Sequence, residues 1–408
     1  MGISNLLMNL KSVITRKHLR DYSGLTIGVD ASCWLHKGVY SCSPELCKGI
    51  PTLAYVDYCM TNVRTLLDHN IKLYIVFDGD ALPMKKGTVD ERRATREKNL
   101  ARALEHEKLG ETTAARKCYN GAVERTPEMG RAFMDALTEH RVPFVVAPYE
   151  ADSQLAYMAH NNIIDVVLTE DSDLIAYGVK HVLFKWERDT LEGDAYCFDQ
   201  IGACKKLDLA GLSYRSFLHM CILSGCDYLD SLPSIGMVNA NKYVRRFQNM
   251  KTFFRNIRFA GKIKMPPGYE DNFNNAVLTF LYARVWCTKT HRVVHVRPLP
   301  DAIDPNKLSF LGPIMTHDVA AGIACGDLNP FTRKTMVKAT GSKTVIGNGS
   351  GGERSQPVLS SARSNMSSLP RRQKKQQNVN QYLMPVATSA LRKEFKNPVI
   401  QKSNTTGS

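Results

Sequence analysis

Acidic residues recur directly after short apolar segments of this chain. Asp30 and Asp78 each follow one such segment, and the acidic motifs Glu150-Ala151-Asp152 and Glu170-Asp171-Ser172-Asp173 each follow another. Carboxylates gathered in one place raise one another's pKa, and a bound divalent cation keeps them ionised. A ligand set made of oxygen alone favours Mg²⁺ or Mn²⁺ over zinc. The sequence therefore predicts a metal site formed by Asp30, Asp78, Glu150, Asp152, Asp171 and Asp173.

The four apolar segments have the length and composition of buried strands. They are short and rich in β-branched residues, and stretches with helical character separate them. Strands that alternate with helices form a parallel sheet, and functional groups gather at the carboxyl ends of such strands. We therefore expect an α/β fold with a mostly parallel central sheet, helices on both faces, and strands at residues 25–29, 73–77, 143–147 and 165–169.

The charge of the chain indicates a polyanionic partner. Its 408 residues carry a formal net charge of +15, although charge alone does not distinguish DNA from RNA or an anionic membrane. Residues 346–408 hold ten Lys or Arg and two Asp or Glu and lack apolar periodicity, so we expect this basic tail to be disordered. The run 370–375 within it fits a nuclear-import signal, a DNA-binding arm or a merely solvated basic stretch.

Cysteine and histidine usage argues against other metal chemistry. Eleven cysteines occur without a Cys-x-x-Cys pair, which argues against a disulfide framework and a zinc ribbon and favours a reducing compartment. We expect Cys33, Cys221 and Cys287, which lie in apolar stretches, to be small buried hydrophobic side chains. His36 lies near Asp30, but no second His or Cys stands at ligand spacing, so we expect it to serve packing or a DNA contact.

Two segments between and after the predicted strands have helical and basic character. Residues 84–141 mix Lys and Arg with acids and show little apolar stripe, which fits either a salt-bridged surface hairpin or a basic gateway for nucleic acid. An apolar helix at 215–224 precedes Asp227, a seventh carboxylate, and a Gly-containing turn at 232–237 precedes a basic helix. This arrangement fits a backbone grip on duplex phosphates or a helical hairpin that only packs. We also expect a helix at 270–287 and irregular covering structure without chemistry at 293–330.

Several motifs occur in the order typical of one nuclease family. They are Met1-Gly2-Ile3, Val76-Phe77-Asp78-Gly79, Ala147-Pro148-Tyr149-Glu150-Ala151-Asp152, Thr169-Glu170-Asp171-Ser172-Asp173-Leu174 and Ser224-Gly225-Cys226-Asp227-Tyr228. Over residues 1 to about 335 the chain resembles the flap-endonuclease/XPG (Rad2-type) nucleases. Segments 33–38 and 220–229 are most similar to the exonuclease branch of that family.

The resemblance implies a PIN-like nuclease fold with defined regions. A nuclease core at 1–345 would contain an N-terminal nuclease region at 1–99, a helical arch at 84–141, an internal nuclease region at 138–229 and a helix-two-turn-helix DNA-binding element at 215–260. The basic tail would follow at 346–408.

The resemblance also implies roles for individual residues. Two Mg²⁺ ions, replaceable by Mn²⁺, would be held by Asp30, Asp78, Glu150, Asp152, Asp171, Asp173 and Asp227, while Lys85 and Arg92 would act as catalytic groups on the scissile phosphate. A monovalent cation, K⁺ in the family, would bind backbone oxygens around Ser224, Ser231 and Ile235. DNA contacts are implied for Gly2, His36, Lys85, Arg92, Arg93, Arg96, Ser234, Gly236, Lys242 and Arg245.

Two residues and one segment depart from the family pattern. Ser32 stands where the exonuclease branch has an aromatic side chain, so nucleotide positioning is expected to be weaker. Ser234 replaces the first glycine of the usual turn, and the DNA grip then requires Ser234 to tolerate that backbone geometry. Residues 381–384 lack the paired aromatics of a sliding-clamp motif.

The expected function is a Mg²⁺-dependent, structure-specific 5′-to-3′ double-stranded DNA exonuclease that also cuts 5′ flaps. It would act in nuclear DNA repair or recombination, as a monomer without a membrane association, on duplexes with 5′ ends, nicks or 5′ flaps. Two cations stabilise both the attacking and the leaving oxygen of a phosphodiester. The alternatives are a flap endonuclease proper and a catalytically silent DNA-binding scaffold, against which the presence of all seven carboxylates argues.

Overall fold

The computed structural model describes residues 2–247 and 249–338. The predictions made for the basic tail, including its run at 370–375 and the segment 381–384, therefore lie outside the described residues. All eleven cysteines lie within the described part and are free. Among the described residues, no helix is both long and apolar enough to cross a membrane.

A seven-stranded sheet in the order β1-β7-β6-β5-β2-β3-β4 forms the centre of the fold. The four predicted strands are present as β2 (Thr26–Asp30), β3 (Lys72–Phe77), β4 (Phe144–Val146) and β5 (Val166–Thr169). Their mutual pairings are all parallel, because each is followed by a helix that returns the chain to the same edge. The prediction of a mostly parallel sheet is confirmed.

The other half of the sheet was not predicted from the sequence. Strand β6 (His181–Glu187) pairs in parallel with β5, whereas β7 (Glu192–Cys197) is antiparallel to β6 and β1 (Ile14–His18) is antiparallel to β7. The three central residues of β1, Thr15, Arg16 and Lys17, are exposed. A polar edge strand of this kind lacks the apolar alternation by which strands are recognised.

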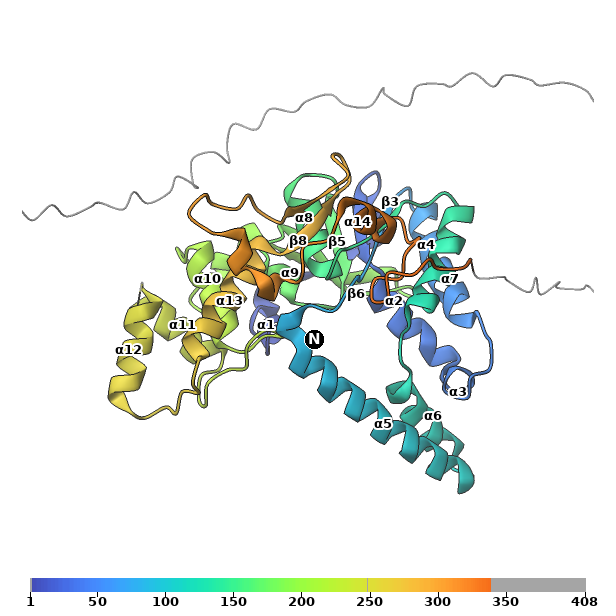
Figure 1. Cartoon of the computed structure of the whole chain (residues 1–408), viewed down its shortest axis with the longest axis horizontal. Coiled ribbons are helices and arrows are strands. Elements are labelled where there is room, and N and C mark those ends of the chain that lie inside the picture. Colours follow the sequence, from blue (N-terminus) through green and yellow to red (C-terminus); the bar gives the residue numbers. More distant parts are fainter. Residues whose placement is uncertain (1, 248, 339–408) are drawn as a thin grey trace, which may run out of the picture. The chain divides into compact units, whose positions relative to one another are not determined.

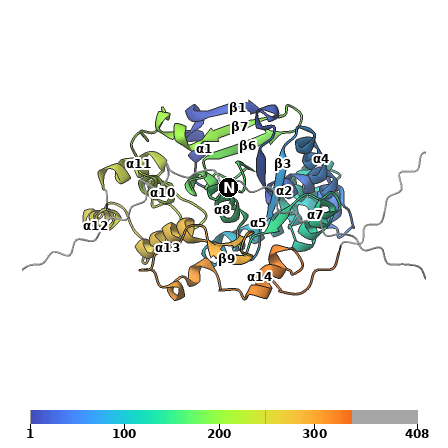
Figure 2. The same ribbon diagram turned by 90° about the horizontal axis from the view of Figure 1, so that it is seen from above.

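Helices cover both faces of the sheet, as predicted (Figure 2). Successive residues of one strand point to opposite faces, so Ile75 joins one apolar core and Val76 the other. The core on the Ile75 face is completed by α2 (Ala31–Gly38), α4 (Ala54–Asp68) and α7 (Pro127–Glu139). The core on the Val76 face is completed by α8 (Ala151–His160), α10 (Tyr214–Leu223) and α13 (Tyr269–Tyr282).

The segment 84–141 divides into two parts of different character. After a short turn, α5 (Lys86–Lys108) and α6 (Thr112–Ala122) lie side by side (Figure 1) and share a small cluster of Ala103, Ala115 and Tyr119. In contrast, α7 buries Phe133 and Leu137 in the main core. The expectation of little apolar stripe therefore holds for α5, which shares only the small cluster with α6, but it is wrong for α7, whose apolar residues recur at helical spacing.

The remaining elements surround these layers. Helices α11 (Met237–Arg246) and α12 (Met250–Ala260) follow α10, and the predicted helix 270–287 ends at Tyr282 because residues 284–287 form β8 (Arg284–Cys287), paired with β9 (Arg292–His295). The short helices are α1 (Leu6–Asn9), α3 (Ser43–Cys47), α9 (Asp173–Ala176) and α14 (His317–Ala324).

One buried side chain joins β8 to helix α8 beside the central sheet. Gln154 of α8 is fully buried, its Nε2 donates to the backbone oxygen of Trp286 at 2.8 Å, and its Oε1 accepts from the backbone N–H of Trp286 at 2.7 Å. The amide thus satisfies both backbone groups of Trp286. A side chain without these polar atoms would leave both groups buried and unpaired.

We therefore expect Gln154→Leu to lower the free energy of unfolding by about 2–6 kcal/mol, since each of the two unpaired buried groups costs about 1–3 kcal/mol. Asn161→Leu, an exposed amide at the end of the same helix whose side chain bonds only to Tyr157, should change stability by about 0.5 kcal/mol or less. Thermal and urea unfolding of the two variants checks this. If both variants lost the same free energy of unfolding, the hydrogen bonds of Gln154 to Trp286 would not be what stabilises the fold.

Candidate metal centre and nucleic-acid interface

The acidic residues of the four predicted strand ends lie at one edge of the sheet. Asp30 ends β2, and Asp78 follows β3. Glu150 and Asp152 stand at the start of α8, which follows β4, while Asp171 and Asp173 stand between β5 and the first turn of α9. Because parallel strands all end at this edge, residues as far apart in sequence as Asp30 and Asp173 become neighbours.

The three carboxylates of Asp152, Asp171 and Asp173 form the most compact part of this group. Each offers one oxygen, and these oxygens lie within 4.8 Å of one another. Asp173 is fully buried, and neither of its carboxylate oxygens has a hydrogen-bond partner among the residues that the structure describes. One buried oxygen of Asp152 is likewise unpartnered. Buried anionic oxygens without donors are costly unless a cation pairs with them, so this arrangement fits a divalent metal ion.

Burial and mutual repulsion disfavour the ionised form of these carboxylates. Burial, together with the charge of Asp78, raises the pKa of Asp30 to about 6. Burial and the charge of Asp171 raise the pKa of Asp152 and of Asp173 well above the usual range. The carboxylates thus need positive charge to remain ionised at neutral pH.

Lys85 supplies part of that positive charge. Its Nζ lies 2.5 Å from Oε1 of Glu150 and 3.2 Å from Oδ2 of Asp227. Burial opposes the charge of Lys85, but Glu150, Asp173 and Asp227 outweigh burial and raise the pKa of the ammonium group well above its usual value. An Nη2 atom of Arg92 lies 3.5 Å from Oδ2 of Asp227. The structure therefore brings both predicted catalytic groups and the seventh carboxylate to the acidic edge.

Several side chains that orient the carboxylates were missed in the sequence. The hydroxyl of Tyr228 donates to Oε2 of Glu150, and the hydroxyl of Tyr177 lies 3.1 Å from that of Tyr228. The ammonium group of Lys85 lies 5.2 Å from the centre of the Tyr228 ring. Tyr228 follows Asp227 directly in the quoted motif, so the motif carried a signal for it, whereas nothing near Tyr177 in the sequence indicates its place.

Two neighbours in α2 contact the first two carboxylates. Cys33 is buried, as predicted, and in addition it donates from Sγ to Oδ2 of Asp30 at 2.8 Å. Ser32 donates from Oγ to Oδ2 of Asp78 at 2.5 Å, while the backbone N–H of Ala151 donates to Oδ1 at 2.9 Å. Both oxygens of Asp78 are therefore held by donors.

Gly2 lies against the acidic group. It has φ +82°, and a Cβ at this position would stand 2.1 Å from Oδ1 of Asp171. The backbone N–H of Ile3 donates to Oγ of Ser172 at 2.9 Å. A residue with a side chain at position 2 would thus displace a carboxylate that is a predicted metal ligand.

The other residues predicted to contact DNA lie on α2 and α5, and they differ in whether their side chains are free to bind a phosphate. His36 is exposed, and its Nε2 lies 2.7 Å from the hydroxyl of Tyr40. Arg93 is exposed on α5, whereas an Nη2 atom of Arg96 donates to Glu124 at 2.7 Å. The ion pair of Arg96 fits the salt-bridged alternative for this segment at that position. Arg93 stays available for a phosphate.

The turn before α11 brings the remaining predicted residues together. Ser234 has φ +66°, a left-handed conformation that favours glycine, and it nevertheless adopts the geometry required there. A Cβ at Gly225 would lie 3.3 Å from the backbone nitrogen of Ser231, so the chain around Ser224 approaches that turn closely. Ile235 is buried and Gly236 is the residue before α11. The cation site around Ser224, Ser231 and Ile235 stays a prediction.

The two basic residues predicted on α11 differ. Lys242 is exposed. Arg245 donates to the backbone oxygens of Asp208 at 2.9 Å and of Ala210 at 2.8 Å, and pairs with the Asp208 carboxylate at 3.0 Å. Its guanidinium is therefore engaged within the chain, which leaves Lys242 as the more available of the two.

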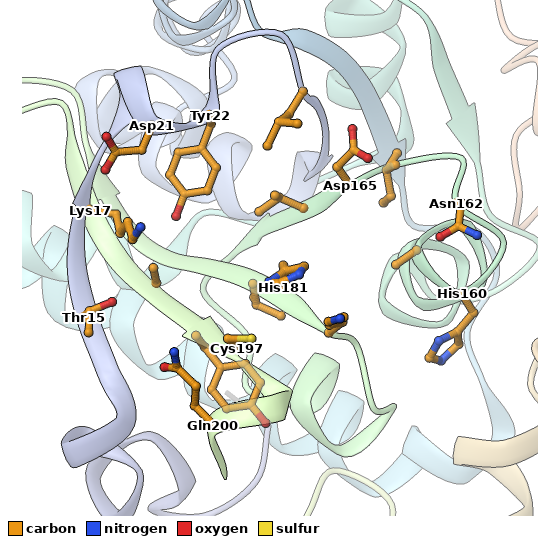
Figure 3. A pocket seen from close by; sticks show the side chains of 18 residues that line it. Thr15, Lys17, Asp21, Tyr22, His160, Asn162, Asp165, His181, Cys197 and Gln200 are labelled. Carbon is orange, nitrogen blue, oxygen red and sulfur yellow. The ribbon is translucent and has the colours of Figure 1, made fainter. Parts of the chain in front are cut away.

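A cavity of about 600 Å³ lies elsewhere in the fold, and Figure 3 shows the side chains that line it. It is lined at the amino ends of β5 and β6 by Asp165, Val166 and His181, with Lys17 of β1 across from them. None of the predicted site residues lines it. The cavity therefore does not change the assignment of the candidate site to the carboxyl edge of the sheet.

Neutralising one buried carboxylate should stabilise the metal-free protein. The pKa of Asp173 is raised in the folded state, so ionisation costs stability as the pH rises from the unfolded-state pKa, about 3.9, through the folded-state pKa. In EDTA at pH 8 we expect Asp173→Asn to raise the Tm by several degrees, a difference that shrinks as the pH falls toward 4. Asp199→Asn, an exposed carboxylate paired with Lys180, should show no such gain. A lower Tm of Asp173→Asn than of the parent would contradict this account.

Comparisons with known proteins agree with this geometry. The family model described as XPG N-terminal domain matches residues 1–99, and the one described as XPG I-region matches residues 141–227. Exonuclease 1 of Arabidopsis thaliana is 40% identical over 333 residues, which are 82% of this chain and 45% of that protein. Exonuclease 1 of Xenopus laevis is 38% identical over 343 residues, which are 82% of this chain and 46% of that protein. The chain thus spans less than half the length of these relatives.

A shorter relative and a solved structure complete the comparison. The DNA damage-inducible protein DIN7 of Saccharomyces cerevisiae is 31% identical over 303 residues, which are 74% of this chain and 70% of that protein. The catalytic core of Rad2 in complex with DNA substrate (complex IV) superposes with a TM-score of 0.54 at 18% identity, over 79% of this chain and 98% of that one. The expected nuclease fold is confirmed by this likeness. Both family models match the chain, and the relative DIN7 is similar to it along most of its length. The chain therefore belongs to the XPG/Rad2-type nuclease family.

Proposed function

We propose that this chain is a Mg²⁺-dependent, structure-specific nuclease that digests double-stranded DNA from the 5′ end and also cuts 5′ flaps. The single observation that carries the proposal is the group of Asp152, Asp171 and Asp173, which each offer one oxygen within 4.8 Å of the others and in part lack a donor among the described residues. The relatives named exonuclease 1 support the exonuclease activity. The 5′-to-3′ polarity follows from the family resemblance.

The metal ions would be held by the carboxylates of the acidic edge. Asp152, Asp171 and Asp173 would form the centre of the site, with Asp30, Asp78, Glu150 and Asp227 around them as ligands, directly or through water. Bound divalent cations supply acidity to a water molecule and positive charge to the leaving oxygen. Mn²⁺ would substitute for Mg²⁺ because both accept oxygen ligands.

The chain's own residues would contribute charge and geometry. Lys85 and Arg92, which stand beside Glu150 and Asp227, would neutralise charge on the phosphoryl oxygens as the bond breaks. Tyr228 and Ser32 would hold the carboxylates of Glu150 and Asp78 in one orientation through their hydroxyl groups. The attacking group in this scheme is water, so no side-chain nucleophile is required.

The duplex would be held mainly away from the acidic edge. The turn at Ser234 and Gly236, with exposed Lys242 behind it, would contact phosphates through backbone amides and one ammonium group. A K⁺ ion around Ser224, Ser231 and Ile235 would brace that turn. DNA as the partner agrees with the Rad2 core, whose structure is a complex with a DNA substrate. Action as a monomer in nuclear DNA repair or recombination completes the proposal.

The decisive experiment compares the protein with its Asp173→Ala variant on end-labelled duplex with a recessed 5′ end and on a matched 5′-flap duplex, in Mg²⁺. We expect stepwise loss from the 5′ end and flap cleavage by the parent. The variant should lose nearly all cleavage, by about a hundredfold or more, and bind duplex within a few-fold. Asp199→Ala, which removes an exposed carboxylate elsewhere, should cut normally.

The same experiment separates the alternatives. Cleavage confined to the flap junction would indicate a flap endonuclease proper. Binding that EDTA leaves intact, without any cutting, would indicate a DNA-binding scaffold. Loss of binding together with cleavage in Asp173→Ala would contradict the division between metal centre and duplex grip.

The duplex grip is tested by the salt dependence of binding. Replacing one phosphate-contacting Lys reduces the slope of log K against log salt by about 0.9 for duplex DNA. We expect this reduction for Lys242→Ala and a smaller one for Arg245→Ala, whose guanidinium is already bonded to Asp208 and Ala210. Lys180→Ala, paired with Asp199, serves as the control. An unchanged slope for Lys242→Ala would remove α11 from the interface.

A further inference from the structure

A second cavity, of about 460 Å³, lies beside the β8–β9 hairpin, where β9 and α14 are neighbours (Figure 2). Its ionisable lining residues are two arginines and two histidines: Arg284, Arg292, His295 and His317. No carboxylate lines it among residues 2–247 and 249–338. The volume lies within the roughly 300–1,000 Å³ of pockets that enclose small molecules. The cavity therefore has the size of a small-molecule site and the charge of an anion site.

Arg284 is a buried cation that has no counterion within the described part of the chain. Only 5% of its surface is exposed, and its one hydrogen bond to that part runs from Nη1 to the backbone oxygen of Gly312 at 3.3 Å. Burial lowers the pKa of the guanidinium, which has five N–H donors in all. A neutral amide could make the bond to Gly312, so this bond does not account for a buried charge. Because such a charge is costly unless an opposite charge pairs with it, Arg284 favours an anionic ligand.

The register of the hairpin places the other basic residues around Arg284. His295 lies directly opposite Arg284, so the two side chains share one face of the hairpin. Nδ1 of His295 lies 2.6 Å from the backbone oxygen of Tyr282, which fixes the imidazole ring. Arg292 is three positions from His295, on the other face, and it is exposed. The cavity thus has one cation buried in its wall and a second cation at its exposed rim.

The remaining wall of the cavity is apolar. It is formed by Val293, Val294, Pro305, Ile314 and Met315. Ile314 keeps 71% of its surface exposed, so a ring system that covers it would remove apolar surface from water. The ring of His317 lies 27° from parallel to that of Trp286 and adds a flat surface. Apolar and aromatic side chains of this kind bind nucleobases regardless of sequence.

We propose that this cavity binds a nucleoside 5′-monophosphate. The phosphate would pair with Arg284 and Arg292, and the base would lie against Ile314, Met315 and His317. The choice of a nucleotide rests on the proposed function, because stepwise digestion from the 5′ end would release mononucleotides. The anion site itself follows from the charges of the cavity. No carboxylate of the predicted metal centre lines this cavity, so the two sites are separate.

The chemistry of the wall favours a nucleotide over an acidic peptide as occupant. A phosphate can accept two parallel hydrogen bonds from one guanidinium, which makes the pairing strong and directional. An acidic peptide offers carboxylates to Arg284 and Arg292 but no planar group to the apolar wall. Asp304, which precedes the lining residue Pro305, accepts a backbone N–H of Asn306 at 2.9 Å and does not line the cavity.

The test is calorimetric titration of the full chain in EDTA. Without metal ions, the carboxylates of the acidic edge repel phosphate, so binding there does not interfere. The probes are dAMP, inorganic phosphate, deoxyadenosine and hexaglutamate. We expect dAMP to bind at least about tenfold more tightly than phosphate or deoxyadenosine, the equivalent of about 1.4 kcal/mol, because each of these makes only one of the two kinds of contact.

Variants of the two arginines connect this binding to the cavity. Arg284→Gln keeps a donor for Gly312 but removes the charge, and it should weaken dAMP binding by about tenfold or more. Arg292→Gln removes an exposed charge at the rim and should weaken binding by about threefold or more. Arg255→Gln is the matched control, since Arg255 of α12 is exposed and does not line the cavity. It should bind dAMP as the parent does, and the Tm shows whether each variant is folded.

Several results would overturn the inference. They are a lack of dAMP binding by the parent, an unchanged dAMP affinity of folded Arg284→Gln, and an equal loss in Arg255→Gln. If Arg284→Gln does not fold, an unchanged affinity of Arg292→Gln has the same meaning. Phosphate that binds as tightly as dAMP would leave an anion site without a place for the base, and binding of hexaglutamate alone would assign the cavity to an acidic protein segment. Failure of the proposed function is recognised separately, as a lack of Mg²⁺-dependent duplex cleavage by the parent.

Discussion

The repulsion among carboxylates that the fold buries at one edge of its sheet is the constraint on which the rest of the structure depends. Asp173 is fully buried, with both oxygens unpartnered within residues 2–247 and 249–338, and Asp30 and Asp171 are nearly as inaccessible. Such a cluster destabilises the folded state unless cations compensate it. Two apolar cores, one on each face of the sheet, provide the stability that holds these groups in place. Stability and function therefore oppose each other at this edge.

The surrounding residues meet this constraint in two different ways. Lys85 compensates charge, because its ammonium group lies between Glu150 and Asp227. Tyr228 and Ser32 supply hydrogen-bond donors that fix carboxylate orientation without adding charge. The second kind of contact leaves the net negative charge available for metal ions. A site with only lysines and arginines around it would neutralise the carboxylates and weaken their affinity for metal.

The carboxylates and four strands could be predicted because their signals are local. A β-branched run followed by an acidic residue identifies both a strand and its end, as for Asp30 and Asp78. Strand β1 has no such signal because its central residues are polar and exposed. The contacts of Ser32 with Asp78 and of Tyr228 with Glu150 join residues 46 and 78 positions apart. They depend on side-chain geometry that only the assembled sheet defines, and no periodicity of the sequence encodes them.

The type of a residue alone also does not show what its side chain contributes to the site. Arg245 counts as a cation in the composition, yet its guanidinium is bonded to backbone oxygens at Asp208 and Ala210. Ser32 is the converse case, because a small residue in place of an aromatic one suggests a loss of nucleotide positioning. In the folded chain that small residue borders a cavity whose far wall carries Phe331, almost 300 positions later. Two positions that local sequence comparison would never align can therefore line the same cavity.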